Sequence, residues 1–86
     1  MPKPKYELFE GVGPSGFGGR LVNLRTKRRL SRKQLASEIR VTVPTIRLWE
    51  MGAYSPGYWN LVEIAKFFEI SPNWLMGMST LKEHLE

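Results

Sequence analysis

The sequence predicts an all-α domain of five short helices, preceded by an N-terminal arm. Two observations support this prediction: apolar residues recur at intervals of three and four along most of the chain, and Ser31, Thr42 and Ser71 stand as capping residues before successive apolar stripes. Few segments show the alternation that is typical of a strand. At 86 residues the chain has room for one small hydrophobic core, so we expect a single domain.

Residues 1–16 are interpreted as a partly disordered arm. The segment MPKPKYELFEGVGPSG is rich in proline and glycine and has no helical period. The arm contains four apolar residues, Tyr6, Leu8, Phe9 and Val12. They indicate that part of the arm packs on the domain or on a second copy of the chain. We expect the domain to span residues 17–77 and a tail to follow over residues 78–86. The segment STLKEHLE is consistent with a further helical turn, and its last two residues, Leu85 and Glu86, are consistent with a cloning scar.

The first two helices are predicted between residues 17 and 39. The apolar face of the first recurs at intervals of four, three and four residues, at Phe17, Leu21, Leu24 and Arg28. Ser31 stands three residues before Gln34, which is the spacing of a capping box. The second helix is therefore predicted from Arg32 to Ile39.

The third helix is predicted to begin after Thr42 and to end at Gly52. Thr42 is a suitable N-cap, and Pro44 lies in the first turn, where a missing amide is tolerated. Ile46 and Trp49 are three residues apart and form the inner face. Gly52 is placed to end the helix in the left-handed conformation.

Two further helices complete the prediction. The fourth runs from Tyr58 to Phe68, and its apolar stripe consists of Leu61, Ile64, Ala65 and Phe68. The fifth is short, from Pro72 to Met76, with Ser71 before it and Gly77 as its stop.

Positive charge is concentrated in one third of the chain. Residues 20–50 carry nine lysines and arginines against two glutamates, whereas residues 1–19 are neutral and residues 51–86 carry an excess of acidic groups. Such a patch suits a polyanion, because neutralised phosphates release their counterions. A solvated basic surface is the alternative reading of the same pattern.

Several function classes are excluded by composition. Without cysteine the chain has no disulfide, thiolate metal site or cysteine nucleophile, and this suits the cytoplasm. No apolar run is long enough for a membrane span, and the start lacks the apolar middle of a signal peptide. His84 is the sole histidine and stands near the end of the sequence without a carboxylate cluster, so we expect no enzyme, metal site or cofactor.

The second and third helices are separated only by Arg40, Val41 and Thr42, a connection typical of a helix-turn-helix unit. With the motifs LSRKQLA, TIRLWEMG and ISPNWLMG in this order, residues 17–77 resemble the Cro/CI (XRE-type) family of phage and bacterial transcriptional regulators. The resemblance implies a lambda-repressor-like domain that binds double-stranded operator DNA as a homodimer. Its third helix would enter the major groove.

Residue roles follow from the helical faces and from this resemblance. The resemblance implies a structural ion pair between Arg25 and Glu50, which would neutralise a carboxylate next to a core tryptophan. Base contacts are assigned to Val43, Pro44, Arg47 and Leu48. Phosphate contacts are assigned to Arg32, Lys33, Tyr54, Ser55, Gly57 and Tyr58. The resemblance implies a dimer surface at Tyr58, Trp59, Ile70, Trp74 and Leu75.

Some roles stay open. Arg47 suits bidentate contact with guanine, and a phosphate contact is its alternative. A stacking role of Trp49 on DNA is not expected, because Trp49 belongs to the core. Three further cations, Lys27, Arg28 and Arg29, are expected either to contact DNA or to be solvated. Lys3 and Lys5 would follow a DNA groove or belong to a disordered arm.

The sequence departs from the family pattern in three places. Arg40 stands where glycine is usual, so we expect a positive φ there and an outward side chain. Arg32 stands where glutamine is frequent, and it can still bind a phosphate. The connection AYSPG lacks the lysine or arginine often found before the fourth helix.

Two functions are consistent with these patterns. The first is a dimeric, sequence-specific DNA-binding regulator, for which we expect a repressor of the phage or prophage type. The second is a protein-interaction module on the same fold, such as the antitoxin of a toxin pair, with the apolar outer face or the YELFEGV segment binding a protein. Antitoxins of this fold usually bind DNA as well, so the two functions are compatible.

Overall fold

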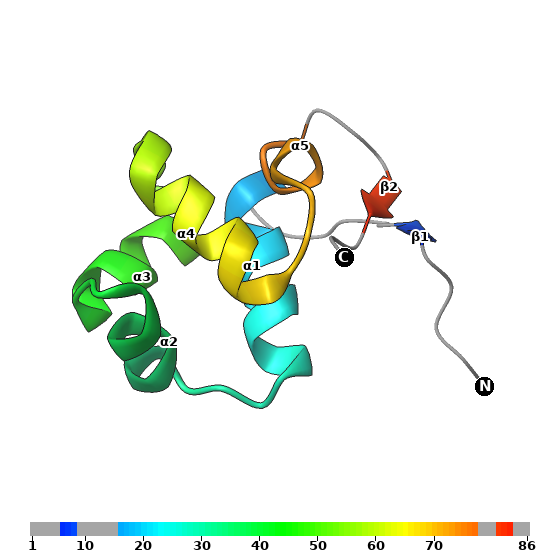
Figure 1. Ribbon diagram of the computed structural model, residues 1–86. Coiled ribbons are helices and arrows are strands. Elements are labelled where there is room, and N and C mark those ends of the chain that lie inside the picture. Colours follow the sequence, from blue (N-terminus) through cyan, green and yellow to red (C-terminus); the bar gives the residue numbers. More distant parts are fainter. Residues whose placement is uncertain (1–5, 9–15, 78–80, 84–86) are drawn as a thin grey trace.

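The computed structural model describes residues 6–8, 16–77 and 81–83, which form five helices and two short strands (Figure 1). The five predicted helices are confirmed, and the fifth ends at Leu75, one residue earlier than predicted. The elements in chain order are β1 (Tyr6–Leu8), α1 (Gly16–Lys27), α2 (Arg32–Ile39), α3 (Val43–Glu50), α4 (Tyr58–Phe68), α5 (Pro72–Leu75) and β2 (Leu81–Glu83).

The predicted caps of α2 and α3 are both present. Ser31 Oγ accepts a hydrogen bond from the Gln34 amide at 3.0 Å, and the Ser31 amide donates to Gln34 Oε1 at 2.8 Å, which completes the capping box. Thr42 Oγ1 accepts from the Thr45 amide at 3.3 Å. These bonds pair amides that the first turn of a helix leaves without an intrahelical acceptor.

The turn between α2 and α3 passes through a left-handed residue. Arg40 has φ 60° and ψ 47°, and its amide donates to the Ala36 carbonyl. The positive φ and the exposed side chain predicted for this position are therefore confirmed. Gly52 after α3 also has the predicted left-handed conformation, with φ 77°.

The hydrophobic core lies between α1 and the other four helices. Helix α1 packs against α3 and α5, and α4 packs against α2 and α5. In Figure 1, α4 crosses in front of α1, with α2 and α3 on one side. The predicted apolar stripes face this core, whose buried members are Leu21, Leu24, Leu35, Ala36, Ile39, Ile46, Trp49, Leu61, Ile64, Ala65, Phe68, Ile70, Trp74 and Leu75.

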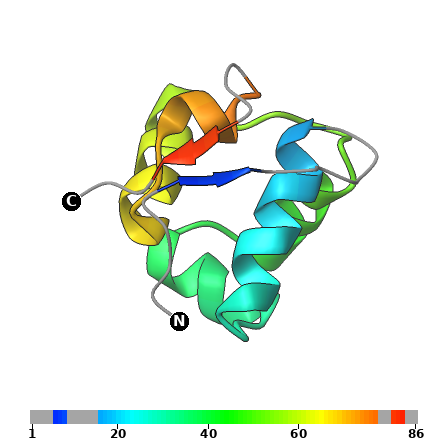
Figure 2. The same ribbon diagram turned by 90° about the vertical axis from the view of Figure 1, so that its right-hand side faces the viewer.

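The two strands were not predicted from the sequence. They pair antiparallel, with Tyr6 opposite Glu83 and Leu8 opposite Leu81, so residues 81–83 form a strand where a further helical turn was one reading of the sequence. Figure 2 shows them side by side, and in Figure 1 they lie on the side of the molecule away from α2 and α3. Three residues are too few for a recognisable strand pattern. The positions discussed above at Lys3, Lys5 and His84 lie outside the described residues.

Replacing Arg40 by glycine is expected to stabilise the fold by about 0.5–1 kcal/mol, because glycine adopts a positive φ without the clash of a Cβ atom. Urea unfolding measures this difference. Arg40→Ala is the matched control, since it removes the same exposed side chain and keeps Cβ, and no gain is expected from it. Equal stabilisation by both variants would show that the loss of charge, and not the backbone, is responsible.

Candidate nucleic-acid interface

Helix α3 has a buried face and an exposed face. Ile46 is fully buried, and Trp49 and Glu50 are 4 % and 5 % exposed. The other face carries the four residues expected to contact bases, Val43, Pro44, Arg47 and Leu48. Three of them are exposed, whereas Val43 is half-buried against the core. The exposed face therefore offers one charged group among apolar side chains.

The buried carboxylate of Glu50 forms the ion pair expected with Arg25. Arg25 of α1 donates from Nε to Glu50 Oε2 at 2.6 Å and from Nη2 to Oε1 at 3.3 Å, and its Nη1 donates to the Leu30 carbonyl at 3.0 Å. A buried carboxylate without such partners would cost several kcal/mol. The pair thus allows Glu50 to lie in the core and fastens the last residue of α3 to α1.

A second arginine binds the same carboxylate, and this contact was not predicted. Arg32 of α2 donates from Nε to Glu50 Oε1 at 2.8 Å, and its side chain remains 42 % exposed. From its position in the sequence, Arg32 was expected only at a phosphate. Residues 32 and 50 share no local pattern, so no sequence signal links them. The packing of α2 on α3 brings them together.

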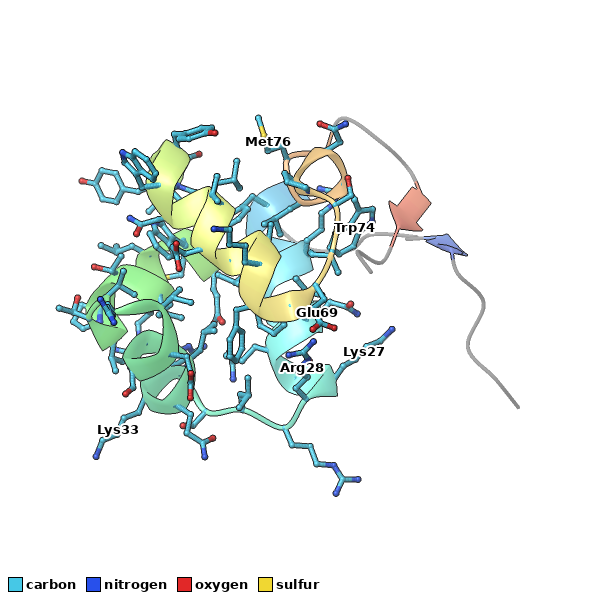
Figure 3. The ribbon with its side chains drawn as sticks, viewed as in Figure 1. Lys27, Arg28, Lys33, Glu69, Trp74 and Met76 are labelled. Carbon is cyan, nitrogen blue, oxygen red and sulfur yellow. The ribbon has the colours of Figure 1, made fainter. Side chains whose placement is uncertain are left out.

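Arg28 is bound to the end of α4. Its Nη1 donates to the Phe67 carbonyl at 3.0 Å and its Nη2 to the Phe68 carbonyl at 3.1 Å, and the guanidinium lies 5.0 Å from the centre of the Phe68 ring. A cation is favoured at a helix C-terminus. Figure 3 shows Arg28 and Lys27 well separated from Lys33 of α2. Arg28 therefore stabilises the end of α4, a role different from both the DNA contact and the solvation expected as its alternatives.

The connection between α3 and α4 presents the other residues expected near phosphates, which are Tyr54, Ser55, Gly57 and Tyr58. All four are exposed. Gly57 is the N-cap of the 11-residue α4 and has no side chain to cap it, so the amides of the first turn keep their capacity to donate. Amides of this kind favour an anion.

Three of the five residues expected at a dimer surface lie inside the domain. Ile70, Trp74 and Leu75 are at most 1 % exposed. The prediction was wrong for these three, because Ile70 and the two α5 residues Trp74 and Leu75 belong to the core of the chain itself, where α5 packs on α1 and α4. Tyr58 and Trp59 are 71 % and 76 % exposed, and their rings meet edge to face at 5.6 Å.

The exposed positive charge that remains lies mainly on α2, the turn and α3. In the ranges that the structure describes, the side chains of four cations in residues 20–50 make no hydrogen bond or ion pair, namely those of Arg29, Lys33, Arg40 and Arg47. Three of these belong to the α2–turn–α3 unit. This unit therefore has the charge needed to approach a polyanion.

Neither a membrane span nor a metal centre is found among the described residues. None of their helices has the length and apolarity needed to cross a bilayer. Nor do three or more of their histidine or carboxylate side chains gather as metal ligands would.

Replacing Arg25 by methionine is expected to lower the free energy of unfolding by roughly 3 kcal/mol, because the buried Glu50 carboxylate loses its bidentate partner. Denaturant unfolding checks this value. Lys33→Met is the control, since Lys33 is exposed and unpaired, and a change within about 0.5 kcal/mol is expected. If Arg25→Met changed the free energy of unfolding as little as Lys33→Met does, the Arg25–Glu50 pair would not be what holds α3 on the domain.

Comparison with known proteins identifies the same unit. The profile of the helix-turn-helix family matches residues 21–75. The P22 c2 repressor, solved in complex with synthetic operator 9T in the presence of Tl+, is 26% identical, with a TM-score of 0.68 over 71% of this chain and 92% of that chain. The restriction-modification controller protein C.AhdI from Aeromonas hydrophila is 30% identical, with a TM-score of 0.64 over 70% of this chain and 91% of that chain. No curated protein sequence matches significantly.

The family match covers most of the helical domain. It runs from Leu21 in α1 to Leu75 in α5 and includes the α2–turn–α3 unit and both members of the Arg25–Glu50 pair. A repressor and a controller protein share the fold. The chain therefore belongs to the helix-turn-helix family of DNA-binding transcriptional regulators.

Proposed function

We propose that the chain represses transcription by binding double-stranded operator DNA, with α3 in the major groove and α2 across the backbone. The observation that carries the proposal is the two-sided α3, whose inner face is anchored through Glu50 while its outer face is exposed. The P22 c2 repressor, which has the same fold and was solved with an operator, supports it. We place the protein in the cytoplasm, which its lack of cysteine suits.

Base reading is assigned to the exposed face of α3. Arg47 is the only charged side chain on this face and has the two donors needed for the O6 and N7 atoms of guanine. Pro44 and Leu48 are exposed and apolar, which suits the methyl group of thymine. Val43 offers only part of its surface, because it also packs on the core. Apolar contacts distinguish between bases less well than paired hydrogen bonds do. One copy would therefore prefer its own site only modestly over other DNA sequences.

Backbone contacts are assigned to α2 and to the start of α4. Lys33 and Arg32 supply the charges on α2, and the exposed hydroxyl groups of Tyr54 and Ser55 supply neutral donors. The amides near Gly57 and Tyr58 complete the set, because no side chain caps them. Such contacts position the protein and carry no sequence information.

A second copy is proposed to contact the aromatic surface formed by Tyr58 and Trp59. Exposed tyrosine and tryptophan side chains often anchor protein interfaces. Residues 51–62 carry no charge, whereas the whole chain carries +5, so two copies approach each other there with the least repulsion. A dimer would read two half-sites one helical turn apart. No described feature favours a toxin partner over DNA, so we prefer the regulator.

Replacing Arg47 by alanine is expected to weaken binding to the preferred site about tenfold or more and to change binding to random duplex little. Lys33→Ala should weaken binding to both duplexes alike and lower the slope of log affinity against log salt by about 0.9. Fluorescence anisotropy over a range of salt concentrations, on a site selected from a random DNA pool, measures both effects. The same losses from both variants on both duplexes would contradict these roles.

Replacing Trp59 by alanine is expected to reduce the cooperative binding of two copies to paired half-sites by about tenfold or more and to leave binding to one half-site unchanged. A mobility-shift titration on single and paired half-sites separates the two quantities. Met51→Ala, at another exposed apolar residue, is the control. Unchanged cooperativity in Trp59→Ala would place the dimer contact elsewhere.

A further inference from the structure

Only one edge of the Arg32 guanidinium is occupied. Its Nε donates to Glu50, and neither Nη group makes a hydrogen bond within the described part of the chain. Arg25 is different, since it donates from Nε, Nη1 and Nη2 and its side chain is only 12 % exposed. Of the two arginines that share Glu50, Arg32 is the one whose Nη groups are both unused and whose side chain is exposed to a ligand.

The charges of this cluster are not balanced. One carboxylate, Glu50, faces two guanidinium groups, so the three side chains together remain positive. Arg25 donates twice to Glu50 and is largely buried, whereas Arg32 donates once and its side chain is the exposed one. An anion from solution can therefore meet the net positive charge of the cluster at Arg32. A phosphate oxygen is the partner that best suits such a group.

The cluster also joins the two helices of the helix-turn-helix unit. Arg32 is the first residue of α2 and Glu50 is the last residue of α3. A ligand held by Arg32 is thus linked to α3 through one buried carboxylate. Lys33, the next residue, is exposed and has no such link.

We infer that Glu50 is a positioning residue for DNA binding, which holds Arg32 at Nε so that its Nη groups grip one backbone phosphate and set the register of α3 in the groove. This inference rests on the proposed function and goes beyond the role of Glu50 in fastening α3. An arginine can present two donors to one phosphate. A side chain already held at Nε loses less rotamer freedom on binding than an unpaired lysine does.

A double-mutant cycle tests the inference. The affinity for the preferred duplex is measured for the wild type, Glu50→Gln, Arg32→Ala and the double variant, with circular dichroism to verify folding. Glu50→Gln should lower affinity about tenfold in the wild-type background and less than about twofold in the Arg32→Ala background, because its effect acts through Arg32. Equal losses in the two backgrounds would overturn the inference.

Arg32→Lys decides the question if Glu50→Gln does not fold. This variant keeps the charge but not the fork of donors, so affinity should fall about fivefold while the salt slope stays unchanged. Wild-type affinity in Arg32→Lys would overturn the inference. Lys66→Arg, at an exposed lysine of α4 that is assigned no DNA contact, is the control and should bind within about twofold of wild type. If the wild type itself bound no duplex, the proposed function would fail, and this inference with it.

Discussion

The orientation of α3 depends on the buried carboxylate of Glu50. The helix has eight residues, and a helix of this length has little stability of its own in water. Burial of Ile46 and Trp49 holds its inner face, and Arg25 and Arg32 attach its last residue to α1 and α2. Since one carboxylate joins three helices, the position of the whole helix-turn-helix unit on the domain depends on it.

This anchoring limits what the outer face can read. Three of the eight residues are buried, and the half-buried Thr45 is hydrogen-bonded to the Thr42 hydroxyl. Four side chains remain for the outer face, and Val43 among them is itself half-buried. Arg47 is the single charged reader among them. Apolar contacts with thymine methyl groups distinguish bases weakly, so strong specificity would have to come from a second copy or from the shape of the DNA. The fold thus holds α3 in a defined position, but the outer side chains of α3 by themselves provide little selectivity for a DNA sequence.

Local features of the fold could be predicted from the sequence because their interactions span few residues. The left-handed Arg40 was expected through the resemblance to a family that has glycine at this position, whereas the capping box at Ser31 and the cap at Thr42 each depend on neighbours three positions away. The periodic apolar stripes identified the five helices and most of the core for the same reason. The Arg25–Glu50 pair, 25 residues apart, was expected only through the resemblance to a known family, since no local pattern joins its members.

Tertiary packing decided the remaining features. The sequence by itself determined where the helices begin and end and that residues 20–50 are strongly basic. It did not determine which cations stay available, because Arg28 binds carbonyls 39 and 40 residues away and Arg32 binds Glu50. The burial of α5 and the pairing of β1 with β2 likewise depend on distant segments. Charge and period are properties of neighbouring residues, whereas partners and burial exist only once the helices have packed.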